Sequence, residues 1–176
     1  MLPYIIVTAV LIITILFIVF KVGYDKLSDS SIKITEGRET INVMLKKKLE
    51  LTIKIVDEME AISDNKYNDE FNMSDSEELD SINLNKKLNE YYYKILEIVE
   101  YNVELVLSDD GSKNLKQLKK LTLELIGVEK YYNENAIIYN KLLRRFPNNI
   151  IGKMKKYSKL ETYDNSKKER FEMLNK

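Results

Sequence analysis

The residues that could carry chemistry gather in positions 131–152, YYNENAIIYNKLLRRFPNNIIG, where aromatic rings, asparagines and two arginines stand close together. The chain contains no cysteine and no histidine, so it lacks thiolate nucleophiles, imidazole bases and the usual ligands of zinc and haem. Carboxylate, amine and hydroxyl groups remain. A catalytic tyrosine would need a general base on the same helix face within one turn, and this stretch offers none.

The spacing of this stretch instead predicts packing. Its aromatic and apolar residues continue a pattern of alternating steps of three and four, which is the heptad signature of a buried helical seam. The expected seam is Leu118, Leu121, Leu125, Val128, Tyr132, Asn135, Tyr139, Leu142 and Phe146. Asn135 resembles the single seam asparagine that fixes register. Pro147 is expected to end the helix, because a residue before proline avoids the α conformation.

Two charged groups offer alternative sites. Glu97, Glu100 and Glu104 could gather a divalent cation, although the di-iron bundles also need histidine, which this chain lacks. The basic segment 141–159 could bind a polyanion, while residues 57–80 are strongly acidic. If the helices of a bundle alternate in direction along the chain, the basic segment and the acidic residues 57–80 both lie at the end of that bundle far from the apolar N-terminus. The two charged segments then face one another. We expect no nucleic-acid binding and no cofactor.

The N-terminus is long and apolar enough to cross a membrane. No charge occurs from Leu2 to Phe20, and a helix of that length covers about 27–30 Å. A cleaved signal peptide would carry a basic start and a small-residue cleavage site, and neither is present. Lys21 and Lys26 follow the span closely and set the expected topology, in which the bulk of the chain is cytoplasmic.

Beyond the span the periodicity predicts three long helices. They cover about 25–63, 77–107 and 112–146, separated by a polar loop at 64–76 and by the turn formers Asp110 and Gly111, with Ser112 as N-cap. Gly37 is the weak point of the first. The expected fold is all-α: an N-terminal transmembrane helix, 1–23, then an antiparallel bundle of three long helices with room for a short fourth helix, 24–160, and a polar tail, 161–176.

The segments VMLKKKLELTIKIV (43–56) and AIIYNKLLRRFPNNIIG (136–152), together with the N-terminal span, resemble the LemA family of bacterial membrane-anchored proteins. Where the family tends to place proline and asparagine, this chain has Ile53 and Lys54, which should straighten its first helix. The resemblance implies a membrane-anchored helical bundle without established enzymatic activity. We therefore expect a non-enzymatic scaffold or protein-interaction module at the cell membrane, with an unidentified protein partner and the option of homo-oligomer formation.

Overall fold

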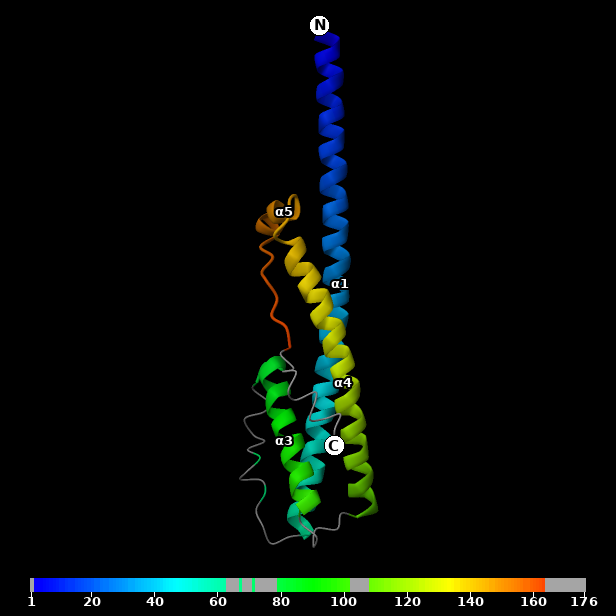
Figure 1. The fold of residues 1–176 in the computed structure, drawn as a ribbon, viewed down its shortest axis with the longest axis vertical. Helices are drawn as coiled ribbons and strands as arrows, with labels where there is room; N and C mark the ends of the chain where they lie inside the picture. Colours follow the sequence, from blue (N-terminus) through cyan, green and yellow to red (C-terminus); the bar gives the residue numbers. More distant parts are fainter. Residues whose placement is uncertain (1, 63–66, 68–70, 72–78, 102–107, 164–176) are drawn as a thin grey trace. The chain divides into compact units, whose positions relative to one another are not determined.

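The computed structural model describes residues 2–62, 67, 71, 79–101 and 108–163, and the elements within these residues are helices (Figure 1). The all-helical prediction is confirmed. The described residues divide into two compact units. Unit 1 combines residues 1–37 with 130–176, and unit 2 comprises residues 38–129. The predicted division into 1–23, 24–160 and 161–176 separates a membrane anchor, a bundle and a tail. The two units instead group the residues that pack against one another.

Helix α1, Leu2–Ile62, joins the apolar N-terminus and the first predicted bundle helix without a break. Its first part contains an 18-residue window of mean hydropathy 3.0 with none of it buried, so length and composition would allow it to span a membrane. Gly37 does not weaken the helix. It is buried, and a Cβ atom at this position would lie 3.5 Å from the Cβ of Tyr132, an ordinary van der Waals distance, so Gly37 marks where α1 packs against the helix that carries Tyr132.

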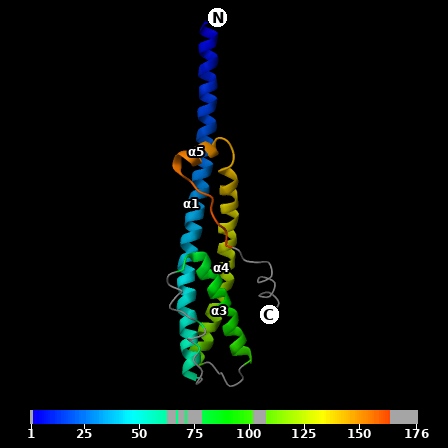
Figure 2. The same cartoon turned by 90° about the vertical axis from the view of Figure 1, so that its left-hand side faces the viewer.

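In unit 2, helix α3, Ser81–Tyr101, runs beside α1 in the same direction (Figure 2). Ser81 donates to Asn42 at 2.6 Å, and further along both helices Lys48 donates to Asn89. Asp80 caps α3, because its Oδ1 accepts from the backbone N–H groups of the second and third helical residues at 3.0 and 3.1 Å. Because α1 and α3 are parallel, the antiparallel pairs of the bundle are those that the following helix forms with them.

Helix α4, Asp109–Leu142, reverses direction and crosses both units. The expected turn at Asp110 and Gly111 is wrong, because both residues already belong to the helix. Ser108 is the N-cap in place of Ser112, since its hydroxyl accepts from the Gly111 N–H at 3.1 Å. Glu58 of α1 fixes this start by accepting from the Ser108 N–H at 2.8 Å.

After α4 the chain turns sharply into the short helix α5, Asn148–Lys155, which is the fourth helix that the sequence left room for. Lys156 ends α5 in the left-handed region with φ of 54°, and the Tyr157 N–H donates to the Gly152 carbonyl at 2.8 Å. Residues 157–163 then form an extended segment, which we call the strap. It belongs to unit 1, as does the last part of α4, from Lys130 onward.

The buried face of α4 follows the predicted seam in part and departs from it at Val128 and Asn135. Leu118, Leu125, Tyr132 and Tyr139 are buried as the spacing predicts, and so is Leu121. However, Val128 and Asn135 are only half-buried. The helix buries the residue that follows each of them, Glu129 and Ala136, and it also buries Thr122. At the first of these positions apolarity selected Val128 in place of the buried Glu129, and at the second the strict steps of three and four selected Asn135 in place of the buried Ala136.

Candidate functional site

The predicted seam residues end at the junction of α4, α5 and the strap. Tyr132 and Tyr139 are 2% and 5% exposed, and Leu142 is half-buried. The prediction that Phe146 is buried is wrong, because its side chain is 59% exposed. Helix α4 ends at Leu142, before Phe146 could join the buried face. Pro147 is buried and is the N-cap residue of α5.

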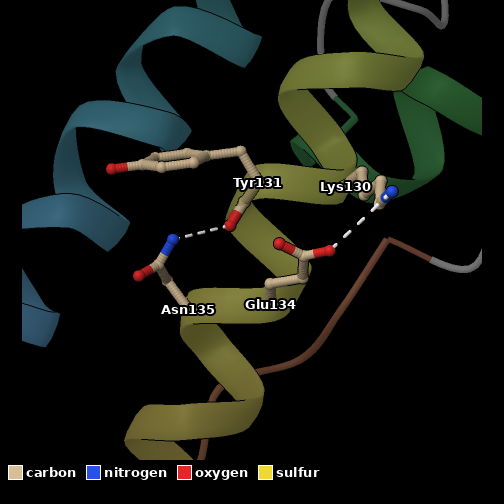
Figure 3. Close-up of polar contacts among 4 residues, drawn as sticks. All are labelled: Lys130, Tyr131, Glu134 and Asn135. Carbon is tan, nitrogen blue, oxygen red and sulfur yellow. Dashed lines mark hydrogen bonds and ion pairs between the residues drawn. The ribbon is translucent and has the colours of Figure 1, made fainter.

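Asn135 does not act as a seam asparagine. Its side-chain amide donates to the carbonyl of Tyr131, one turn earlier on the same helix, at 2.8 Å (Figure 3). On the neighbouring surface of α4, Lys130 and Glu134 form an exposed ion pair at 4.0 Å. Both contacts are local to one helix and exposed, so they neither fix the register of the bundle nor form a binding site.

The asparagines that organise this end of the molecule are Asn133 and Asn140, which lie seven residues apart on one face of α4. Asn140 accepts from the Leu160 N–H and donates to the Leu160 carbonyl, both at 2.9 Å. Asn133 makes the same pair of bonds with the backbone of Tyr163, both at 2.8 Å. Each side-chain amide thus bonds both the N–H and the carbonyl of one strap residue, as a neighbouring strand would. The strap is therefore held to α4 through its backbone.

Tyrosines complete this arrangement and explain why the aromatic stretch is structural. The Tyr132 hydroxyl donates to the Glu161 carbonyl at 3.2 Å, and its ring packs edge-on against Tyr163 with centroids 5.2 Å apart. Burial raises the pKa of Tyr139, and the nearby Tyr157 raises it further. A phenol with a raised pKa stays protonated at neutral pH, so Tyr139 is not poised to act as a general base.

The basic segment 141–159 lies beside the end of the apolar run of α1, and the prediction that it lies at the opposite, distal end of the bundle is wrong. Phe146 contacts Phe20 edge-on, with ring centroids 5.6 Å apart. Gly23 faces Pro147 and Asn148 so closely that an added Cβ atom would lie 2.9 Å from the proline Cγ. The alternation argument failed because α3 runs parallel to α1, so that α4 returns along α1 toward its N-terminal part. Much of the acidic block 57–80 falls outside the described residues.

A cavity of about 370 Å³ separates α5 from α1. Its lining residues are Phe17, Phe20, Lys21, Tyr24, Ile151, Met154 and Lys155. Lys21, which the sequence assigned to topology, therefore also lines this cavity together with a lysine of α5. Lys26 is exposed one turn further along α1. The surface that these side chains present to the cavity is apolar, including the aliphatic parts of the two lysines, so it can hold an apolar group.

A second feature of interest is a set of polar side chains inside unit 2, which sequence reasoning missed. Lys48 is fully buried, and its Nζ donates to Asn89 Oδ1 at 2.5 Å and lies 5.8 Å from the centre of the Tyr92 ring. Burial lowers the pKa of Lys48 to about 7, and the negative charge of Glu129 partly opposes that shift. The buried polar residues of this unit are Lys48, Thr52, Asn85, Asn89, Thr122 and Glu129.

A signal for this cluster was present in the sequence. Lys48 lies seven residues after Ile41 and seven before Ile55, both of which are fully buried on α1. Its position is therefore a core position of the heptad, although it belongs to the basic run Lys46–Lys48. A buried lysine needs acceptors, and those come from Asn89 on α3, with Glu129 on α4 as a counter-charge.

The carboxylates proposed for a divalent cation do not form such a cluster in the part of the chain that can be described. Glu97 and Glu100 are exposed on α3, and Glu104 lies outside the described residues. Within the described ranges, no three carboxylates lie close enough together to hold a metal ion. The chain matches no protein-family model, and comparisons with the curated proteins and with the solved structures found no significant match.

Proposed function

We propose that this chain is a membrane-anchored helical-bundle protein of the LemA type, which acts as a non-enzymatic scaffold or interaction module at the bacterial cell membrane. The observation that carries this proposal is the contrast between the two parts of α1. Apolar side chains from Tyr4 to Val19 are 38–78% exposed, whereas from Leu27 onward the helix buries a regular stripe of core residues. One helix therefore provides both a membrane anchor and the first helix of the bundle.

The energetic argument for the anchor is simple. Burying one large apolar side chain is worth about 1.5–3 kcal/mol, so leaving the whole run in water would cost far more than a small domain's net stability. A bilayer removes that cost, because a helix satisfies its own backbone hydrogen bonds in hydrocarbon. Unbroken helix between anchor and bundle also means that no flexible linker separates them at the membrane surface, which suits a scaffold.

Membrane extraction tests the anchor. We expect the full chain to remain in the membrane pellet after alkaline carbonate treatment. A variant with Leu11→Arg and Ile15→Arg should move to the soluble fraction, because each arginine costs about 2.5–3.5 kcal/mol near the centre of a span. Recovery of the unaltered chain in the soluble fraction would exclude the anchor.

Site-specific photocrosslinking tests the interaction role. Val43 and Leu123 are 68% and 56% exposed on helical surfaces of unit 2, and a crosslinker at such positions should capture a defined protein in membranes. Lys113 and Lys116, exposed on α4, are the matched control positions. Equal and unspecific capture at all four positions would argue against a scaffold role.

A second candidate function is polyanion binding through the basic segment 141–159. The observation that favours it is the packing of α5 against residues 17–24 of α1, which brings Lys21 to the same cavity as Lys155. In an anchored chain this places the basic segment at the membrane surface, where anionic groups are concentrated.

A further inference from the structure

We propose that the junction of α1 and α5 is a binding site for an anionic phospholipid, which places an acyl chain against the apolar wall of the cavity and its phosphate between Lys21 and Lys155. This inference rests on the membrane anchoring proposed above and names the ligand of the basic segment. The cavity, the depth of its residues and the surface of α5 each support it.

The chemistry of the cavity matches both parts of such a lipid. Aromatic and aliphatic side chains of α1 and α5 form its walls, and a volume of about 370 Å³ falls within the range of small-molecule pockets. Lys21 and Lys155 line the cavity with the aliphatic parts of their side chains, one from each helix, and each of these side chains ends in an ammonium group. Ammonium groups donate to phosphate oxygens as compact point charges, so two of them can bind one phosphodiester.

The position along α1 sets the depth of this cavity in an anchored chain. Phe17 and Phe20 end the uncharged run, and Lys21 is the first charged side chain after it. The cavity therefore begins at the end of the hydrocarbon layer and opens where lipid phosphates lie, with the lysines at headgroup level. A water-soluble anion would gain nothing from the phenylalanine side of this cavity.

The surface of α5 supports contact with the bilayer rather than with a protein or a nucleic acid. Ile151 is buried against the bundle, but Ile150 and Met154 are 41% and 80% exposed. The lysines at 153, 155 and 156 surround these apolar side chains, and residues 135–160 contain no acidic residue. Exposed apolar side chains among lysines are typical of helices that lie in a membrane interface.

Lipid binding should be measured on the full chain in nanodiscs of mixed phosphatidylglycerol and phosphatidylcholine, by native mass spectrometry of the lipids that stay bound after release. We expect the wild-type chain to retain phosphatidylglycerol preferentially. A lysine near an anionic surface contributes about a fivefold change in affinity, so K21Q with K155Q should lower the retention by about 25-fold. The control is K116Q with K119Q, exposed lysines of α4 whose loss changes the net charge equally.

A second variant tests the apolar wall without changing charge. Met154→Ser should lower retention several-fold, and because Met154 is 80% exposed, the substitution should leave the fold intact. Equal retention in the lysine variant and its control, with both chains still embedded in the discs, would overturn the lipid site and leave the anchor standing. Failure of the wild-type chain to enter the membrane would overturn the proposed function itself. Displacement of the bound lipid by inorganic phosphate would also contradict the proposal.

Discussion

Single buried residues determine how the stability of unit 2 depends on pH. Lys48 has a pKa of about 7 in the folded chain and an ordinary value of 10.5 when exposed. Between these values the unfolded chain binds more protons than the folded chain, so the free energy of unfolding rises with pH. The burial that lowers this pKa thus penalises folding in full below about pH 7, and the penalty falls as the pH rises toward the ordinary value of 10.5.

We expect this slope to reach at most about 1.4 kcal/mol per pH unit between about pH 7 and pH 9, and to be much smaller in Lys48→Met. Urea unfolding of the full chain in mild detergent, followed by helical circular dichroism, measures it. Higher pH is unsuitable because burial also raises the pKa of Tyr92, which works in the opposite direction. Identical slopes in the two proteins would show that Lys48 titrates normally in the folded chain.

Asn140 offers a second test at the residue scale. Asn140→Ala removes both hydrogen bonds to Leu160, each worth about 0.5–1.5 kcal/mol. Hydrogen exchange at the Leu160 amide should therefore accelerate by roughly 5-fold to 100-fold. Asn135→Ala is the matched control, because Asn135 bonds only to its own helix in the described structure and should leave that amide unchanged. If the Leu160 amide stayed protected from exchange in Asn140→Ala, another contact would have to hold the strap.

The same residues show what the sequence could reveal and what it could not. Tyr132 and Tyr139 could be placed in the core because ring size and period agree. Lys48 could not, because charge is the usual sign of a surface and only its partners on other helices make burial tolerable. Asn133 and Asn140 escaped notice for a similar reason, since their partner is a backbone segment twenty or more residues away.

Whole helices were easier to predict than their directions. Amphipathic periodicity is a local property, so the extents of the helices followed from it, although the ends of α4 moved by several residues. Direction depends on the connection between helices. Residues 63–80 could span about 60 Å when extended, which is enough to return the chain along α1 and start α3 parallel to it. The parallel start of α3 brings the basic segment beside the apolar run of α1.

A pair of glycines tests how closely two elements pack. Gly23 of α1 faces Pro147, whereas an added Cβ atom at Gly127 would have nothing within 4 Å outside its own helix. Gly127→Ala should stabilise the chain by about 0.5–1 kcal/mol through helix propensity. Gly23→Ala should lose that gain and destabilise, because the rigid proline ring must move. Equal stabilisation of both variants in urea would show that α5 does not press against α1 at Gly23.

At the scale of the whole molecule, the membrane orientation follows from charges next to the span. Lys21, Lys26, Lys33 and Arg38 follow the apolar run closely. Positive flanks stay in the cytoplasm, so the bundle should be cytoplasmic. The fold adds a reason that the linear sequence does not contain: α5 packs beside residues 17–24 and brings further lysines to the same side of the span.

The absence of cysteine makes this orientation directly measurable, because a single introduced thiol is the only one in the chain. We expect Lys113→Cys, at an exposed position of α4, to resist a membrane-impermeant maleimide in intact cells and to react fully once the membrane is opened. Lys21→Gln with Lys26→Gln should increase the fraction labelled in intact cells, since these lysines provide half of the close positive flank. If Lys113→Cys is labelled in intact cells while Lys21 and Lys26 are unaltered, the bundle lies outside the cell. The lysines of α5 would then face the outer leaflet, and the lipid site would have to be tested against the lipids of that side.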